Sequence, residues 1–261
     1  MPQMPSVSLI FIDTCAPALS KNALGMCLRG FRFEKVKIFT DTPSEYPGFD
    51  CVQIETLASS KSYGDLVLRK VPHFIETDFI LIAHYDGFVL NGDQFSPHFY
   101  FYDYIGAPWQ MFAENCVGNG GFSWRSRRLC EAAASLCAGV DVSSPEDAFI
   151  CREQRQNLEQ SYGCSFPDVN MASHFSFETS VPRYPTFGFH GAFHLPALYR
   201  ENLEFLIQNV PDRLLVPEDP AAQLFVRHLV AQNPQALGVY QSVLEARGAK
   251  ARLSRPADVE G

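Results

Sequence analysis

The sequence predicts an α/β fold in which helices flank a mixed β-sheet, with a helical extension at the C-terminal end. Short apolar runs alternate with stretches of helical periodicity through the first 85 residues, as in layered α/β proteins. From Pro196 onward, apolar residues recur only at helical spacing. With 46% hydrophobic and 19% charged residues, the chain of 261 residues can bury a sizeable core.

The first part of the chain supplies most of the sheet. Apolar, β-rich runs predict four strands, at Val7–Thr14, Lys35–Asp41, Cys51–Glu55 and Asp78–Ala83. Apolar residues at helical spacing predict helices over Pro17–Gly30 and Ser62–Val71, the second of them ended by Pro72. Because parallel strands need long crossover connections, this alternation favours a largely parallel arrangement here.

The pattern changes after residue 100. Two further strands are predicted within 102–109 and 117–126, followed by a helix over 127–138. Ser144 as N-cap and Pro145 at the first helical position predict another helix start. We expect one domain over residues 1–195. A helical extension over 196–261 would pack on it, with a polar tail from about residue 250.

Composition and charge narrow the class of protein. A net charge of −8 argues against a binder of duplex nucleic acid, which needs a concentrated basic surface. The eight cysteines include no C-x-x-C pair, so we interpret them as reduced thiols of a cytoplasmic protein. We expect neither a signal peptide nor a membrane span. Basic residues in the tail leave peripheral contact with the inner face of a membrane open.

Two stretches carry candidate metal ligands. FILIAHYDGFVLN, from Phe79 to Asn91, ends an apolar strand near a carboxylate, and alternation along a strand would place His84 and Asp86 on one side. Open α/β sheets bind ligands at the carboxyl ends of their strands. The alternative is a turn in which Asp86 bonds the backbone. His190 lies between two glycine positions in FGFHG, and a neutral imidazole is a common metal ligand.

Two other stretches carry candidate groups for substrate binding and proton transfer. In VGNGGFSWRS, Asn119, Gly120 and Gly121 would let the backbone approach a ligand, or would form a hairpin turn. In SPEDAFICR, Glu146 or Asp147 could serve as a general base. Acidic residues in the first turn of a helix are also common as partners of its dipole.

Taken in order, these features resemble GT-A-type glycosyltransferases, whose mixed sheet is Rossmann-like. The stretches YDYIGAPW, VGNGGFSWRSRRL, PEDAFICR, FSFE and FGFHG resemble more closely a glycosyltransferase-like family. That family is catalogued mainly as a domain of unknown function, of bacterial surface-polysaccharide type. The resemblance covers about residues 7–195. The Gly-Gly strand followed by the Glu-Asp helix start is also similar to the β-1,4-galactosyltransferase pattern.

The resemblance implies where a nucleotide-sugar donor would bind. The matching positions for the nucleotide base and ribose are Asp13, Thr14, Thr40 and Asp41. Arg69, with Lys70 beside it, matches the basic position that faces the phosphates. The backbone of Asn119, Gly120 and Gly121 would border the donor sugar.

The resemblance also implies a divalent metal. Asp86 matches the metal-binding acid of a D-x-D motif, and His190 matches a histidine that often completes the metal shell. A complete motif would have an acid at position 84, where this chain has His84, a third candidate ligand. One carboxylate with one or two imidazoles suits Mn²⁺ better than Mg²⁺. Without a metal, Arg69 or Lys70 would have to neutralise the leaving diphosphate.

We therefore expect a glycosyltransferase that moves a sugar from a nucleotide-sugar to a hydroxyl of a glycan or glycolipid, with inversion, in surface polysaccharide synthesis. Asp147, or less favourably Glu146, would be the base, and Trp109 could stack on an acceptor ring. The alternative is a non-catalytic module that binds a nucleotide-sugar or glycan on the same fold and does not need Asp147.

Two other enzyme classes receive less support. A sugar nucleotidyltransferase would need a Gly-rich basic loop after the first strand, which DTCAPALSKNAL lacks. A glycoside hydrolase would need two opposed carboxylates, for which Asp86 and Asp147 are the candidates.

Overall fold

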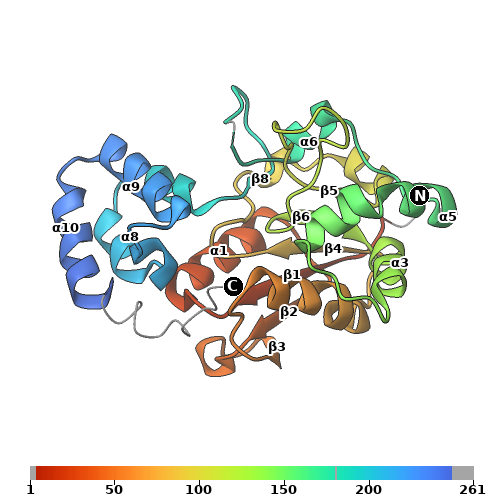
Figure 1. Cartoon of the computed structure of the whole chain (residues 1–261), viewed down its shortest axis with the longest axis horizontal. Coiled ribbons are helices and arrows are strands. Elements are labelled where there is room, and N and C mark those ends of the chain that lie inside the picture. The colour runs from red at the N-terminus through yellow and green to blue at the C-terminus, as the bar shows by residue number, and fades with distance from the viewer. Residues whose placement is uncertain (1–3, 180, 249–261) are drawn as a thin grey trace. The chain divides into compact units, whose positions relative to one another are not determined.

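A six-stranded mixed sheet forms the centre of the larger part of the protein (Figure 1). The computed structural model describes residues 4–179 and 181–248. The strands are β1 (Val7–Asp13), β2 (Lys35–Thr40), β3 (Asp50–Gln53), β4 (Phe79–Ala83), β5 (Tyr104–Ile105) and β6 (Ser123–Ser126). Their order is β3-β2-β1-β4-β6-β5. The first four are parallel, while β6 runs antiparallel to β4 and β5.

This topology confirms the predicted α/β class, in which helices flank a Rossmann-like mixed sheet. The chain leaves β1 towards β2 on one side and later returns to β4 on the other side. Such a reversal of strand order opens a crevice at the carboxyl ends of the strands, which is the usual place for a ligand in these sheets.

Helices and a small second sheet surround the central sheet. The helices of this part are α1 (Pro17–Gly30), α2 (Ser60–Asp65), α3 (Arg127–Cys137), α4 (Glu146–Ala148), α5 (Arg155–Tyr162) and α6 (Val169–Phe175). The small sheet pairs β7 (Ser176–Phe177) with β8 (Gly188–Phe189) in parallel. Side-chain caps fix two helix starts, because Ser126 accepts from Leu129 N and Asp168 accepts from Met171 N.

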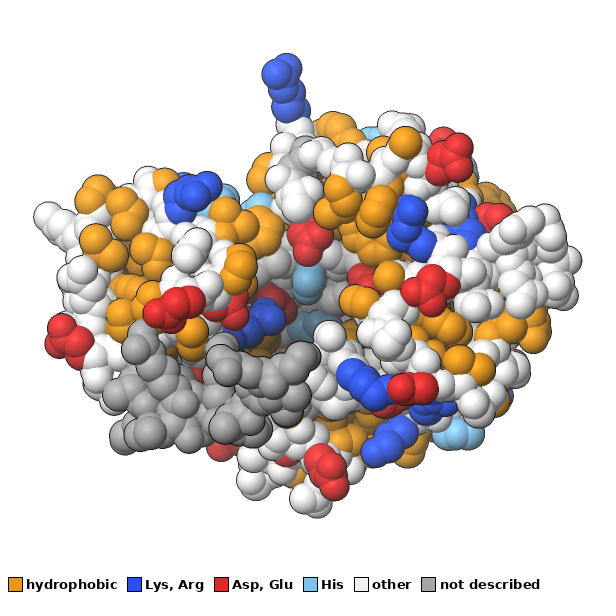
Figure 2. Space-filling model, viewed as in Figure 1, with side chains coloured by type: hydrophobic (Ala, Val, Ile, Leu, Met, Phe, Trp, Pro, Cys, Tyr) orange, Lys and Arg blue, Asp and Glu red, His pale blue; other side chains and the backbone are white. Residues whose placement is uncertain are grey.

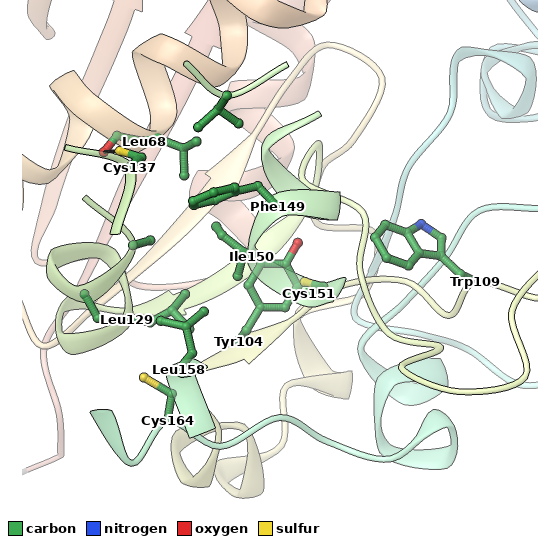
Figure 3. Packing of buried hydrophobic residues seen from close by; sticks show 13 residues of the cluster. Leu68, Tyr104, Trp109, Leu129, Cys137, Phe149, Ile150, Cys151, Leu158 and Cys164 are labelled. Carbon is green, nitrogen blue, oxygen red and sulfur yellow. Dashed lines mark hydrogen bonds between the residues drawn. The ribbon is translucent and has the colours of Figure 1, made fainter. Parts of the chain in front are cut away.

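The core explains why the apolar runs form central strands. All seven residues of β1 are buried, as expected for a parallel strand covered on both faces. One apolar cluster joins Ile10 and Ile82 to Leu66 and Val71, which follow α2. A second cluster packs α3 and α5 around Phe149 (Figure 3). The two clusters thus pack the surrounding helices against the strands of the sheet.

Several predicted boundaries are wrong. The strand predicted within 102–109 shrinks to β5, and the one within 117–126 shrinks to β6, because a loop occupies the residues between them. The predicted helix over 62–71 becomes α2 and then a π-helical turn over Leu66–Lys70. Ser144 is not the N-cap, since Pro145 has extended backbone in that position and the helix begins at Glu146.

The chain groups into two compact units. One contains residues 4–14 together with 21–179 and 181–190, and the other contains residues 15–20 together with 191–248. The second unit carries α7 (Leu195–Leu198), α8 (Leu203–Asn209), α9 (Pro220–Gln232) and α10 (Ala236–Val243). Its core includes Phe225 and Tyr240, whose hydroxyl donates to Leu214 O at 2.7 Å.

The predicted polar tail lies outside the described residues, and the domain division expected at residue 195 stays a prediction. Within 4–179 and 181–248, no helix combines the length and apolarity needed to cross a bilayer.

Candidate functional site

A tight turn follows β4 and carries Asp86. His84 N donates to Gly87 O at 2.8 Å, and Gly87 N donates to His84 O at 3.3 Å, so Tyr85 and Asp86 form the tip. The strand itself ends at Ala83. Strand alternation is therefore the wrong reason for expecting His84 and Asp86 on one side. The turn nevertheless brings their side chains together.

Three side chains form a candidate metal cluster. His84, Asp86 and His190 each offer one ligand atom, and these atoms all lie within 4.8 Å of one another. Asp86 Oδ1 lies 4.0 Å from His190 Nε2. Metal–ligand bonds of about 2.1 Å would place neighbouring ligand atoms about 3 Å apart, so modest side-chain movement would close the set. The donor set fits a divalent metal that accepts both imidazole and carboxylate.

Glu178 orients His190 from its other ring nitrogen. Glu178 Oε1 lies 3.1 Å from His190 Nδ1, and the amide nitrogen of Asn119 lies 3.0 Å from the same atom. Burial acts to raise the pKa of Glu178, but the hydrogen bond and charge of His190 lower it overall. An ionised Glu178 favours the proton on Nδ1, which leaves the Nε2 lone pair directed at the cluster.

Gly120 and Gly121 are required by the protein's own side chains. A Cβ atom at Gly120 would lie 1.8 Å from Glu146 Oε1, and one at Gly121 would lie 2.0 Å from His190 Nε2. The two glycines thus let a carboxylate and an imidazole reach the backbone. The expectation that this backbone borders a sugar stays a prediction, because the close approach already has an internal cause.

The two candidate bases differ in their surroundings. Glu146 is buried and accepts a hydrogen bond from Arg125 at 2.6 Å, in an ion pair whose side chains are 4% and 1% exposed. Burial and Asp147 raise the pKa of Glu146, against the pull of Arg125. Asp147 is half-buried and accepts from Gly120 N at 3.1 Å and from Ala148 N at 2.8 Å. Asp147 is therefore the better placed of the two to meet a substrate.

The candidate base and the metal cluster contact one short segment. Asp147 accepts from Gly120 N, while His190 abuts Gly121 and lies beside the Asn119 amide. Asn119 has a φ of 69°, which turns the backbone at this point. The candidate base and one candidate cation ligand thus contact adjacent residues of the same segment.

The predicted nucleotide-binding residues gather at the carboxyl ends of β1 and β2. Asp13 and Thr40 are register partners in these strands. Asp13 Oδ2 accepts from Tyr46 at 2.6 Å, and Thr40 Oγ1 accepts from Thr42 N at 3.1 Å. The other two residues face the segment after β3: Thr14 accepts from Leu57 N at 3.2 Å and Asp41 accepts from Thr56 at 2.6 Å.

Arg69 binds the end of a helix. Its guanidinium donates to Cys137 O at 2.7 Å and to Val140 O at 2.6 Å, and it pairs with Asp65 at 2.9 Å. Cys137 is the last residue of α3, so this cation satisfies carbonyl groups that the helix leaves free. A role of Arg69 at a diphosphate stays a prediction and would require these bonds to be exchanged.

Some residues of the site carried no clear sequence signal. Tyr63 packs its ring 5.2 Å from that of His84 and donates to Gly120 O at 3.5 Å. Arg125 and Tyr46 fix Glu146 and Asp13 from distant parts of the chain. Glu178 and Arg125 had a signal, because they lie in the FSFE and VGNGGFSWRSRRL stretches that carry part of the family resemblance.

A family model described as "Protein of unknown function (DUF5672)" matches residues 48–190, which is more than half of the chain. The chain belongs to this family. No curated protein matches the DUF5672 chain. The expected membership of a family of unknown function is therefore confirmed, while its glycosyltransferase-like, surface-polysaccharide character stays a prediction.

Two solved structures are similar to this DUF5672 protein at low identity. The mannosyltransferase PcManGT from Pyrobaculum calidifontis, in complex with GDP-Man and Mn²⁺, is 14% identical over 97% of this chain and 79% of that chain, with a TM-score of 0.45. The bifunctional IspDF from Campylobacter jejuni is 10% identical over 57% of this chain, with a TM-score of 0.40. The chain spans 47% of the length of IspDF. Neither likeness assigns an activity or a ligand to this protein.

Proposed function

We propose that this protein is a glycosyltransferase that moves a sugar from a nucleotide-sugar to a hydroxyl of a glycan or glycolipid. The observation that carries the proposal is the cluster of His84, Asp86 and His190, of which His190 contacts the same short segment as Asp147. A cation site and a candidate proton acceptor at the carboxyl edge of an α/β sheet suit transfer from a diphosphate leaving group. The surface-polysaccharide setting rests on the family resemblance alone.

In this proposal the donor lies along the strand ends. Asp13 and Asp41 accept hydrogen bonds from the ribose or base, with Thr14 and Thr40 beside them. Mn²⁺, held by His84, Asp86 and His190, would supply positive charge to the diphosphate. Glu178 keeps His190 in the tautomer that can bind a cation, and burial of Asp86 excludes competing water.

Asp147 acts on the acceptor. Its carboxylate takes the proton of the acceptor hydroxyl while that oxygen bonds to the anomeric carbon of the donor sugar. The bond from this carbon to the diphosphate breaks, and the electron pair leaves with the nucleotide. A single displacement of this kind inverts the anomeric configuration. The backbone amides of Gly120 and Ala148 hold the carboxylate in place by hydrogen bonding to it.

Titration calorimetry with a panel of nucleoside diphosphates, with and without Mn²⁺, tests the proposal. We expect one nucleotide to bind in the presence of Mn²⁺ and to lose binding in Asp86→Asn. Asp93→Asn, at an exposed position in the turn after residue 91, is the matched control and should bind as the native protein does.

Nucleotide binding that does not depend on Mn²⁺ would still support the donor site. It would indicate that Arg69 or Lys70, rather than a metal ion, neutralises the charge of the diphosphate. Failure of every nucleotide to bind would overturn the proposal and favour a glycan-binding module.

A further inference from the structure

A cavity of about 470 Å³ lies within the larger unit, beside the candidate metal cluster. It is bounded by the loop that follows β5, by residues of the segment 169–178, and by Pro182 and Tyr184. Its volume lies in the range of small-molecule sites. None of the residues expected to bind the donor nucleotide lines it.

Aromatic side chains form much of the cavity wall. They are Trp109, Phe112, Phe177 and Tyr184. The Trp109 ring packs directly against the backbone of Gly118, since a Cβ atom at Gly118 would lie 2.1 Å from that ring. In Figure 3 the indole lies to one side of the apolar cluster, away from Leu129 and Leu158. Flat rings of this kind pack against the apolar face of a sugar ring.

The cavity also contains polar groups that point to a ligand. Ser176 is fully buried and lines the cavity, yet its hydroxyl has no hydrogen-bond partner within the part of the chain that the structure describes. Native proteins rarely leave a buried hydroxyl unsatisfied, so this group is available to a bound molecule. Glu178 lines the same cavity and bonds His190. Glu178 thus connects one end of the cavity with His190 of the candidate metal cluster.

Several apolar residues in or next to the cavity lining are exposed. Val169 and Tyr184 are exposed lining residues, and Met111 and Val181, next in sequence to lining residues, are each 65% exposed. Exposed apolar side chains that lie together mark a binding surface. Hydrophobic side chains gather in the α6 region of the face shown in Figure 2. A ligand that leaves the cavity by this route meets apolar contacts.

We propose that this cavity binds the acceptor, and that the acceptor is a sugar carried on an apolar group, such as an alkyl glycoside or glycolipid. The sugar ring packs against Trp109 and bonds Ser176, its reacting hydroxyl faces the Glu178 end, and the apolar group lies along Met111, Val181 and Tyr184. The inference rests on the proposed function, because it assigns the acceptor class for the same transfer.

Titration calorimetry with octyl β-glucoside, octyl β-galactoside and octyl β-mannoside tests the inference. The corresponding methyl glycosides and 1-octanol are the comparison probes. We expect one octyl glycoside to bind at least about tenfold more tightly than its methyl counterpart and than 1-octanol. Trp109 should report the binding by a change in fluorescence, since Trp124, the other tryptophan, is fully buried elsewhere.

Two tyrosine variants form a matched pair. Tyr184→Ala removes a cavity tyrosine that is 39% exposed, whereas Tyr162→Ala removes a tyrosine outside the cavity that is 37% exposed. We expect Tyr184→Ala to weaken octyl glycoside binding about tenfold and Tyr162→Ala to leave it unchanged. Equal binding by the two variants, or equal binding of methyl and octyl glycosides or of 1-octanol, would overturn the inference.

The two proposals fail separately. Nucleotide binding without glycoside binding would leave the donor site standing and remove the acceptor cavity. Glycoside binding without nucleotide binding would keep the cavity and overturn the transferase.

Discussion

Glu178 Oε1 and His190 Nδ1 lie 3.1 Å apart, so a carboxylate holds the side of the imidazole opposite the candidate metal cluster. If the cluster binds Mn²⁺, Glu178→Gln should weaken that binding about 10- to 100-fold, because an amide orients the ring less strongly and no longer favours the Nδ1 proton. Electron paramagnetic resonance of free Mn²⁺ during titration measures the affinity. Glu159→Gln is the control, because Glu159 is an exposed carboxylate that pairs with Arg155. Unchanged affinity in Glu178→Gln would show that the pair has no role in metal binding.

Asp147→Asn separates catalysis from binding. If Asp147 is the base, the rate of sugar transfer should fall about 10²- to 10⁴-fold, because the amide cannot accept the hydroxyl proton. Nucleotide affinity should stay within about twofold, since the amide oxygen can still accept from one of the two backbone donors, Gly120 N or Ala148 N. Single-turnover kinetics and calorimetry on the same preparation measure the two quantities. A variant that transfers at the native rate would remove Asp147 from the mechanism.

The buried pair of Arg125 and Glu146 should govern stability. Arg125→Met leaves the Glu146 carboxylate buried without its cation, and we expect a loss of about 3–5 kcal/mol in the free energy of unfolding. The double variant Arg125→Met, Glu146→Leu should recover most of this loss. Denaturant unfolding measures both, with Glu131→Gln in the exposed Arg127 pair as a control that changes by about 0–1 kcal/mol. If Glu146→Gln instead abolished transfer in a fully stable protein, Glu146 would be the base.

Asp103 should make the protein sensitive to acid. Burial acts to raise the pKa of Asp103, but hydrogen bonds from Arg128, Ser126 and Ser165 lower it overall. A pKa lower in the folded state than in the unfolded state contributes stability that is fully present above the unfolded value of about 3.9. That contribution is lost as the pH falls through the folded value.

The free energy of unfolding at pH 6 and at pH 3 checks this prediction. The native protein should lose stability over this interval, and Asp103→Asn should start lower and lose less. An equal loss in the two proteins would show that other groups cause the acid sensitivity.

Periodicity located the central parallel strands β1 and β4 closely because these strands are buried along almost their whole length. The apolar runs predicted for β1, β2 and β4 differ from the observed strands by one residue. Hydrophobic burial acts on every residue of such a strand, so the run and the strand coincide. β5 and β6 lie at one side of the sheet, and only the short stretches that pair there are strand.

The site was less accessible to sequence reasoning because its contacts join distant residues. A turn, rather than alternation, brings Asp86 to His84, and the pairing of β7 with β8 brings Glu178 to His190. Arg69 matched a basic position by type, but only the folded chain shows that the end of α3 lies within its reach. Residue type identifies which chemistry a side chain can perform, whereas its partner depends on tertiary packing.

The contact between Gly120 and Glu146 links two positions in the evolution of the family. A methyl group at position 120 would overlap the Glu146 carboxylate, so neither residue can change freely while the other remains. Homologues with a larger residue at position 120 should therefore carry a shorter side chain at position 146, and with it a different partner for the cation at position 125. Positions 120, 125 and 146 should therefore covary among the members of the family.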